Sequence, residues 1–201
     1  MADTKVSALT EVGTAVSTDA VYVVLDPTGS PLSRRIQLGN LKKALGVHPD
    51  LMSIFSETQA DTTIGVAGTY VKAANVTTIN NQTAEMTDDT GVSNRVKHTG
   101  AESRHFLVAG HIVFAPASGG ANQELGVKIW HWDDSAGSGS YLPGAHVDTT
   151  IPSASVTGNA AFHGDVLLET DDYLEVHITN ENNANDITVY SVYMVVSGVS
   201  V

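Results

Sequence analysis

Two long stretches of alternating apolar and polar residues constrain the fold of this chain. They run from Ser93 to Phe114 and from Asp171 to Val199. Because successive side chains of a β-strand point to opposite sides, a period of two predicts strands with one buried face. Phe106, Val108 and Ile112 fall on the predicted core face of the first stretch, and Leu174, Val176 and Ile178 on that of the second. In Ala160–Glu169, the predicted core side chains are Phe162, Val166 and Leu168. The pattern therefore predicts an all-β domain.

Shorter strand patterns, separated by polar turns, fill the rest of the chain from residue 68 onward. About eight to ten antiparallel strands with no internal repeat are typical of a jelly-roll sandwich. We therefore expect a jelly-roll head over residues 68–201, preceded by a polar linker over residues 57–67. The candidate strands are Gly68–Ala73, Asn75–Ile79, Ala84–Thr87, Ser93–His98, Arg104–Phe114, Glu124–Trp132, Ala145–Thr150, Ala160–Glu169, Asp172–Thr179 and Ile187–Val196.

The first 56 residues read as a separate small segment. Ala20–Leu25 and Ser33–Leu38 are predicted to form a β-hairpin, because Asp26–Gly29 supplies Pro and Gly for the turn. Short helices are expected at Leu41–Leu45 and Pro49–Phe55. So few residues bury little core alone, so the segment is expected to attach to a partner. The candidate attachment residues are Val6, Leu9, Tyr22, Val24, Ile36, Leu38 and Leu41.

The charge of the chain excludes one class of partner. Residues 57–201 hold five basic and seventeen acidic residues, which account for the whole net charge of −12. Because an acidic surface repels phosphate backbones, we expect no nucleic-acid binding. The chain has no cysteine, no apolar signal core and no run of about 18 apolar residues, so we expect neither disulfides, export nor membrane insertion.

One strand pattern is apolar on both faces. In Ile187–Val196, strict alternation separates one apolar set from a second that contains Val192, Met194 and Val196. A strand of this kind in a single sandwich needs cover on its outer face, which a loop, the N-terminal segment or a second subunit would supply. Aromatic enrichment favours a subunit interface. The candidate interface residues are Ile187, Val189, Tyr190, Tyr193 and Val195.

No motif for catalysis stands out. Ser138 and Ser140 lie in a Gly/Ser run without the order of a nucleophile elbow, and the pairs Asp133/Asp134 and Asp171/Asp172 fall in expected turns. We therefore predict no catalytic residue, no cofactor and no enzyme activity.

Histidines are the candidates for a metal site. His163 and His177 lie on outward faces beside carboxylates, and would converge on a cation if their strands were neighbours. His105 and His111 share one face but stand about 20 Å apart along a strand. Asn180–Asp186 offers oxygen ligands for calcium, but a hairpin turn is favoured there. We predict no metal site.

Aromatic side chains offer a possible contact with carbohydrate. Exposed rings stack on sugars, and Trp130, Trp132 and Tyr141 are the candidates. The alternative to a purely structural protein is therefore a module that binds a host-surface glycan.

Several blocks resemble known phage proteins. The N-terminal K-V-S-A-L-T, D-A-V-Y-V-V-L-D and S-R-R-I-Q-L-G-N-L are similar to the head segment of phage fibre and virion-appendage proteins. The blocks R-H-F-L-V-A-G-H-I-V-F, E-L-G-V-K-I-W-H-W and D-D-Y-L-E-V-H-I-T-N…I-T-V-Y-S-V-Y-M-V-V resemble a phage module related to the tumour-necrosis-factor and complement globular heads.

This resemblance implies a homotrimeric jelly roll on the virion surface of a tailed bacteriophage, made in the host cytoplasm and bound to a capsid or tail protein. Without a long shaft, a capsid decoration or head fibre is favoured over a short tail fibre or a tail-associated receptor-binding protein that recognises host glycan. A signalling ligand of the tumour-necrosis type is disfavoured, because the chain lacks a signal sequence and disulfides.

Overall fold

The computed structural model describes residues 20–25, 32–37, 50–119 and 121–199 of the chain. The chain divides into two compact units, residues 1–48 and 49–201. In the first unit, β1 (Ala20–Leu25) and β2 (Leu32–Gln37) pair antiparallel as the predicted hairpin, with Val21 opposite Ile36. The expected helix at Leu41–Leu45 and the side chains of the candidate attachment residues lie outside the described residues.

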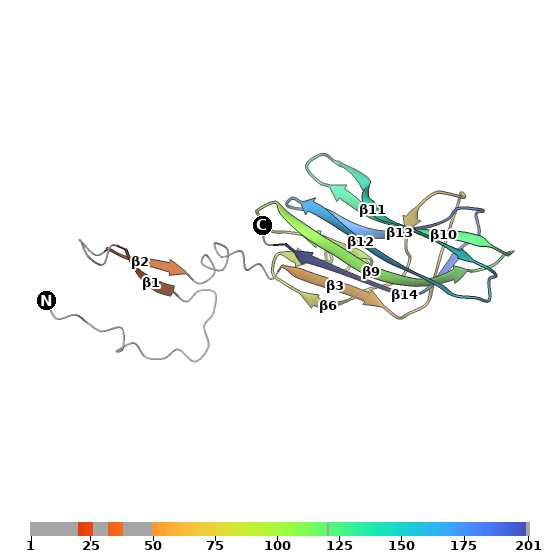
Figure 1. Ribbon diagram of the computed structural model, residues 1–201, viewed down its shortest axis with the longest axis horizontal. Helices are drawn as coiled ribbons and strands as arrows, with labels where there is room; N and C mark the ends of the chain where they lie inside the picture. The colour runs from red at the N-terminus through yellow and green to blue at the C-terminus, as the bar shows by residue number, and fades with distance from the viewer. Residues whose placement is uncertain (1–19, 26–31, 38–49, 120, 200–201) are drawn as a thin grey trace. The chain divides into compact units, whose positions relative to one another are not determined.

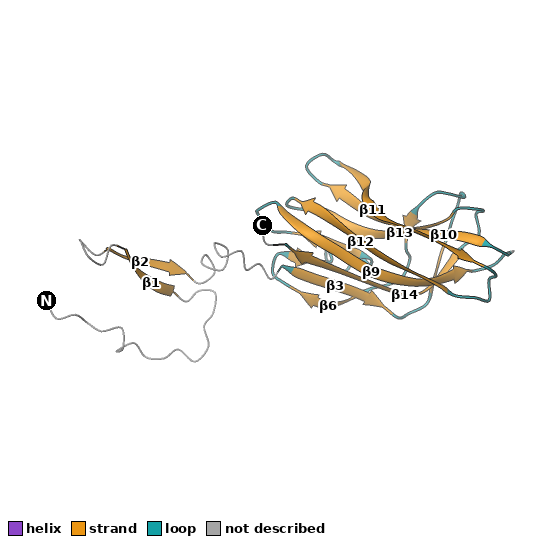
Figure 2. Ribbon diagram, viewed as in Figure 1, coloured by secondary structure: helices purple, strands orange, loops and turns teal. Residues whose placement is uncertain are grey.

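The second unit is a sandwich of two antiparallel sheets (Figures 1 and 2). The β9 sheet has the order β12 (Gly158–Leu168), β9 (Arg104–Pro116), β14 (Ile187–Gly198), β3 (Leu51–Ser56) and β6 (Thr78–Gln82), with β4 (Ala60–Thr62) also paired to β14. The β10 sheet has the order β11 (Ser138–Ile151), β10 (Gln123–Asp133), β13 (Tyr173–Asn180), β8 (Arg95–His98) and β7 (Met86–Thr87), with β5 (Val71–Lys72) also paired to β13.

The long strands cross between the sheets as a jelly roll requires. The chain changes sheet between β9 and β10, between β11 and β12, and at each later connection, while β10 and β11 form a hairpin within one sheet. The segment Asn180–Asp186 was therefore predicted wrongly as a hairpin turn. It joins β13 of one sheet to β14 of the other, because the two strands bury their apolar sides against one another across the core.

The core lies between the sheets and matches the alternation of the sequence. Phe106, Val108 and Ile112 of β9 face Leu174, Val176 and Ile178 of β13 in one buried cluster, to which β12 adds Phe162, Val166 and Leu168. Each fully buried side chain of this size stabilises the fold by about 1.5–3 kcal/mol. The predicted core faces of these three strands are thus confirmed.

The region before residue 68 differs from the prediction. Leu51–Ser56, expected within a helix, forms β3, and β4 falls inside the expected linker. Both pair with β14, which buries Met52 and Ile54 completely and places Thr62 in the interior. Long-range pairing here outweighs weak local helix signals. The head therefore begins at Pro49.

A β-bulge in β14 changes which of its residues face outward. The register to β9 shifts between Val189 and Ser191, so Tyr190 is an extra residue and the alternation reverses there. Ile187 and Val189 consequently lie fully buried in the core, and their assignment to an interface was wrong. Tyr190, Tyr193 and Val195 retain exposed surface, and their place in an interface stays a prediction.

Candidate functional site

The outward side of the β9 sheet is unusually poor in charge. We call its outward side chains the β9 face; they come from β12, β9, β14 and β3. Among these side chains Asp165 is the one aspartate, glutamate, lysine or arginine, and two exposed carboxylates, Asp61 of β4 and Glu57 after β3, lie at the margin. The β9 face comprises Ala161, His163, Asp165, Leu167, His105, Leu107, Ala109, His111, Val113, Ser191, Tyr193, Val195, Ser197, Leu51, Ser53 and Phe55.

Large apolar side chains on the β9 face are open to solvent. Leu107 is 55% exposed and Leu167 44% exposed. They lie on the neighbouring strands β9 and β12 in adjacent rows, because Leu107 pairs with Asp165 and Leu167 with His105. Ala109, in the next row, is also exposed and pairs with Val195 of β14. These three side chains therefore form a contiguous exposed apolar patch.

Aromatic rings extend this surface toward β3. The rings of His111 and Tyr193 stack with centroids 5.8 Å apart, and Tyr193 pairs in register with Phe55. Together with Glu57 and Ser191, these three side chains line a shallow hollow. The hollow is thus lined by three ring-bearing residues and by the end of β3.

The outward side of the β10 sheet is built differently, from rings and charges that contact one another. We call the outward side chains of β11, β10, β13, β8 and β5, together with Tyr70, the β10 face. The Trp130 ring lies parallel to His177 at 5.5 Å and edge-on to Tyr141 at 5.0 Å, while Trp132 stacks on Tyr173 at 5.9 Å. The Arg95 guanidinium lies 3.8 Å from the centre of the Tyr173 ring.

A buried carboxylate anchors this network. Glu175 is 6% exposed, and one of its oxygens accepts hydrogen bonds from Lys72 Nζ at 2.7 Å and Arg95 Nε at 2.9 Å. Burial alone would raise its pKa, but the hydrogen bond with His177 and the charges of Lys72 and Arg95 outweigh it. They lower the pKa of Glu175 to about 2, so the carboxylate is ionised at neutral pH.

The three candidate glycan contacts all lie on the β10 face and are partly buried. One face of Trp130 is occupied by His177. A methyl group on Gly139 would come within 2.2 Å of the Trp130 ring, so this ring also packs over the backbone of the edge strand β11. Trp132 stacks on Tyr173 in the same way. A glycan contact through Trp130, Trp132 and Tyr141 stays a prediction.

The histidines singled out in the sequence do not converge. His105 and His111 are exposed on β9 as expected, and His163 is exposed on β12. His177 lies on β13 of the opposite sheet, where it contacts Glu175. His163 and His177 therefore cannot share a cation, because their strands β12 and β13 lie in different sheets.

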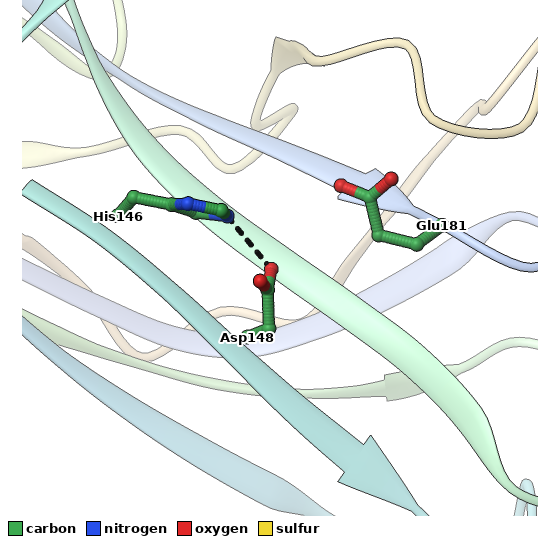
Figure 3. Close-up of side chains that lie close together, drawn as sticks. All are labelled: His146, Asp148 and Glu181. Carbon is green, nitrogen blue, oxygen red and sulfur yellow. Dashed lines mark hydrogen bonds and ion pairs between the residues drawn. The ribbon is translucent and has the colours of Figure 1, made fainter.

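A different cluster, which the sequence did not reveal, brings together His146, Asp148 and Glu181 (Figure 3). One ligand atom from each residue lies within 4.8 Å of the others, and His146 Nε2 is 2.8 Å from Asp148 Oδ1. His146 and Asp148 share one side of β11, which alternation alone could have indicated. Glu181 follows β13, so only the β11–β10–β13 order brings it near.

Asp133 and Asp172, from the two aspartate pairs of the sequence, accept hydrogen bonds within turns. The carboxylate of Asp133 accepts hydrogen bonds from Ser135 Oγ and the Ala136 N–H, and Asp172 accepts from the N–H groups of Asp134 and Glu169. These two carboxylates therefore fix turns, as predicted. Ser138 and Ser140 are exposed on the edge strand β11.

Comparisons with known proteins identify the fold. Eiger TNF from S. frugiperda superimposes with a TM-score of 0.51 at 10% identity, over 76% of this chain and 94% of that one. The globular domain of zebrafish complement 1qA matches with a TM-score of 0.47 at 9% identity, over 75% and 97%. The PRD1 vertex protein P5 matches with 0.44 at 10% identity, over 75% and 96%.

The head is thus a TNF/C1q-like jelly roll. No protein-family model matches the chain, and no curated protein matches it. In the described ranges, no helix has both the length and the apolar character needed to span a bilayer.

Proposed function

We propose that this chain is a non-enzymatic structural protein on the virion surface of a tailed bacteriophage. Residues 1–48 attach it to a capsid or tail protein, and the jelly roll from Pro49 onward is displayed as a homotrimer. A capsid decoration or head fibre fits best. The observation that carries the proposal is the β9 face, which leaves leucines and aromatic rings exposed to solvent with few charged side chains beside them.

Electrostatics supports a second copy of the chain as the occupant of this face. Residues 57–201 hold twelve more acidic than basic residues, so copies of the head repel one another in most orientations. Repulsion is smallest where the surfaces carry least charge, and the β9 face carries Asp165 with Asp61 and Glu57 at its margin. Burial of Leu107, Leu167 and the rings would then drive association. TNF/C1q-like domains commonly form homotrimers.

The virion assignment is supported by the resemblance of both parts of the chain to phage proteins. The paired strands β1 and β2 coincide with the blocks similar to virion-attachment segments. The division at His48 leaves that segment outside the head, as an attachment device requires.

Two measurements test the proposal. Light scattering of the full chain should give three times the mass of one chain, and a monomer would overturn the trimer. Immunogold labelling of purified particles of the phage that encodes the chain should decorate their surface, on the head if the favoured placement is correct. Particles that carry no label while the lysate contains the protein would overturn the virion assignment.

A tail-associated protein that recognises host glycan is the second candidate, and the row of rings on the β10 face favours it. Trp132 lies near the end of this row, beside the exposed turn that begins at Asp134. Trp132→Ala should weaken binding to host-surface polysaccharide and phage adsorption if the row contacts sugar. Unchanged binding and adsorption would remove this candidate.

A further inference from the structure

The cluster of His146, Asp148 and Glu181 has the composition of a site for a divalent cation. It offers one imidazole nitrogen and two carboxylates, all on the outside of the β10 sheet (Figure 3). His146 and Asp148 are exposed and Glu181 is half-buried, so an ion can reach them from solvent. Imidazole with carboxylates suits Zn²⁺, whereas Ca²⁺ takes six to eight oxygen ligands.

The backbone leaves space at this cluster. Gly126 of β10 pairs in register with Asp148, and a methyl group there would lie 2.3 Å from Tyr70 Oη and 2.8 Å from Asp148 Oδ1. Tyr70 Oη is itself 2.9 Å from His146 Nε2. The absent side chain of Gly126 therefore leaves room for Tyr70 and Asp148, which come from two separate segments.

A buried hydroxyl group beside Gly126 lacks a hydrogen-bond partner within the described part of the chain. Thr179 of β13 pairs with Gly126 on the side opposite Asp148, and alternation places its side chain on the outward face. Thr179 is 0% exposed, and its hydroxyl has no hydrogen-bond partner among the described residues. An unpaired buried hydroxyl is costly unless a further group, such as an ion-bound water, completes it.

The charges around the cluster leave it net negative. Asp148 and Glu181 contribute two negative charges, and Lys128 contributes one positive charge, with its Nζ 4.0 Å from the centre of the Tyr70 ring. The Tyr70 hydroxyl, an uncharged donor, lies 2.9 Å from His146 Nε2. Tyr70 is thus a neutral positioning group beside the charged ligands.

We propose that His146 Nε2 and the carboxylates of Asp148 and Glu181 bind one Zn²⁺ per chain, with the Tyr70 hydroxyl as a neighbouring donor. Tetrahedral ligands about 2.0–2.2 Å from zinc lie about 3.3 Å apart. The ligand atoms, all within 4.8 Å of one another, reach this spacing by small side-chain rotations. The ion would join the edge strand β11 to the segment after β13, and so stabilise the folded head.

Calorimetric titration of the full chain, without a histidine tag and freed of metal by chelation, tests the site. ZnCl₂ should bind with one ion per chain and raise the melting temperature, and an equal concentration of CaCl₂ should not compete. His146→Ala should weaken Zn²⁺ binding at least about tenfold and abolish the thermal shift. Glu181→Gln should also weaken Zn²⁺ binding. Because His146 is exposed and Glu181 is half-buried, neither substitution should disturb the core.

His163→Ala is the matched control, because His163 is an exposed histidine on the opposite sheet. It should leave zinc affinity unchanged, while Lys128→Gln should tighten binding several-fold by removing a positive charge. The proposal is overturned if the wild type binds no Zn²⁺, or if His146→Ala binds as tightly as the wild type. Equal losses in His146→Ala and His163→Ala would also overturn it, since binding would then be spread over surface histidines.

Discussion

The two outer faces of the jelly roll differ in whether their side chains contact one another or are exposed to solvent. On the β10 face, polar groups meet within the chain: Glu175 binds Lys72 and Arg95, and the tryptophan rings stack on neighbouring rings. On the β9 face, Leu107 and Leu167 stand in water. Side chains that contact one another within the chain gain little from a partner, whereas covering exposed apolar area lowers the free energy.

We therefore expect the β10 face to contribute to the stability of each chain and the β9 face to contribute to the association of chains. Substitutions on the β10 face should change the unfolding of a single chain, because its contacts lie within one subunit. Substitutions on the β9 face should change the association of chains and leave each fold intact. The following four predictions test that separation in order of decreasing effect.

The largest effect is expected for Ala109→Lys, in the middle of the β9 face. Ala109 is exposed and pairs with Val195 and His163, so in the proposed trimer an ammonium here would be buried between subunits without a partner carboxylate in its own row. Three such charges should weaken the trimer by about 5 kcal/mol or more. Light scattering should report monomers with an unchanged far-ultraviolet spectrum. Ala74→Lys, in an exposed loop, is the control, and loss of the trimer in both variants would contradict the role of the β9 face.

Glu175→Ala should follow, as the strongest change on the β10 face. It leaves Lys72 and Arg95 without the carboxylate that both bind, and breaking a buried ion pair costs about 3–5 kcal/mol. Urea denaturation at a fixed chain concentration measures the loss. Asp165→Asn, the exposed carboxylate of the β9 face, should stay within about 0.5 kcal/mol. Equal losses would refute the contrast between the faces.

Lowering the pH should reduce the free energy of unfolding by a comparable amount, because Glu175 becomes protonated. The pKa of Glu175 falls from 4.5 to about 2 on folding, so its stabilisation is complete above pH 4.5 and is lost as pH decreases toward 2. The pKa difference corresponds to about 3 kcal/mol. Denaturation midpoints at pH 6, 4 and 2.5 should decrease steeply in the wild type and less in Glu175→Gln. Parallel curves for the two proteins would show that another group controls the acid transition.

The smallest expected difference is in the loss of stability caused by alanine at two glycines, one on each sheet. A methyl group on Gly110 of β9 would meet the Tyr193 carbonyl oxygen at 2.2 Å and the Phe162 ring at 2.4 Å, neither of which can move far in a packed sandwich. Gly110→Ala should therefore cost about 3 kcal/mol. Gly126→Ala on β10 meets side-chain ends of Tyr70 and Asp148, which can rotate away, and should cost about 1 kcal/mol. Thermal denaturation of both variants would test this order.

The alternation in the sequence predicted the β9, β12 and β13 core faces correctly, because each of these strands keeps a strict period of two where it is buried. It failed at Tyr190, where one extra residue reverses the faces and moves Ile187 and Val189 into the core. It also failed at Leu51–Ser56, whose apolar residues fit a strand or a short helix until β14 lies beside them. Local pattern cannot resolve either case, since both depend on a distant partner strand.

The candidate sites divide in the same way. Tyr190, Tyr193 and Val195 could be selected from sequence, because aromatic and β-branched residues repeat along one strand. The cluster of His146, Asp148 and Glu181 could not be selected from the sequence. His146 and Glu181 are 35 positions apart along the chain, and they approach only because β10 lies between β11 and β13 in the sheet. Nothing in the residues around Glu181 indicates β11 as a neighbour.

The sequence by itself determined an acidic, cysteine-free, all-β chain with a jelly-roll head and a small N-terminal hairpin, because composition and the period of two are local properties. The tertiary structure alone decided where the head begins, which half of β14 faces outward, and which charged residues meet. These features depend on the register between strands far apart in the chain. A shift of one residue there exchanges the two faces of a strand.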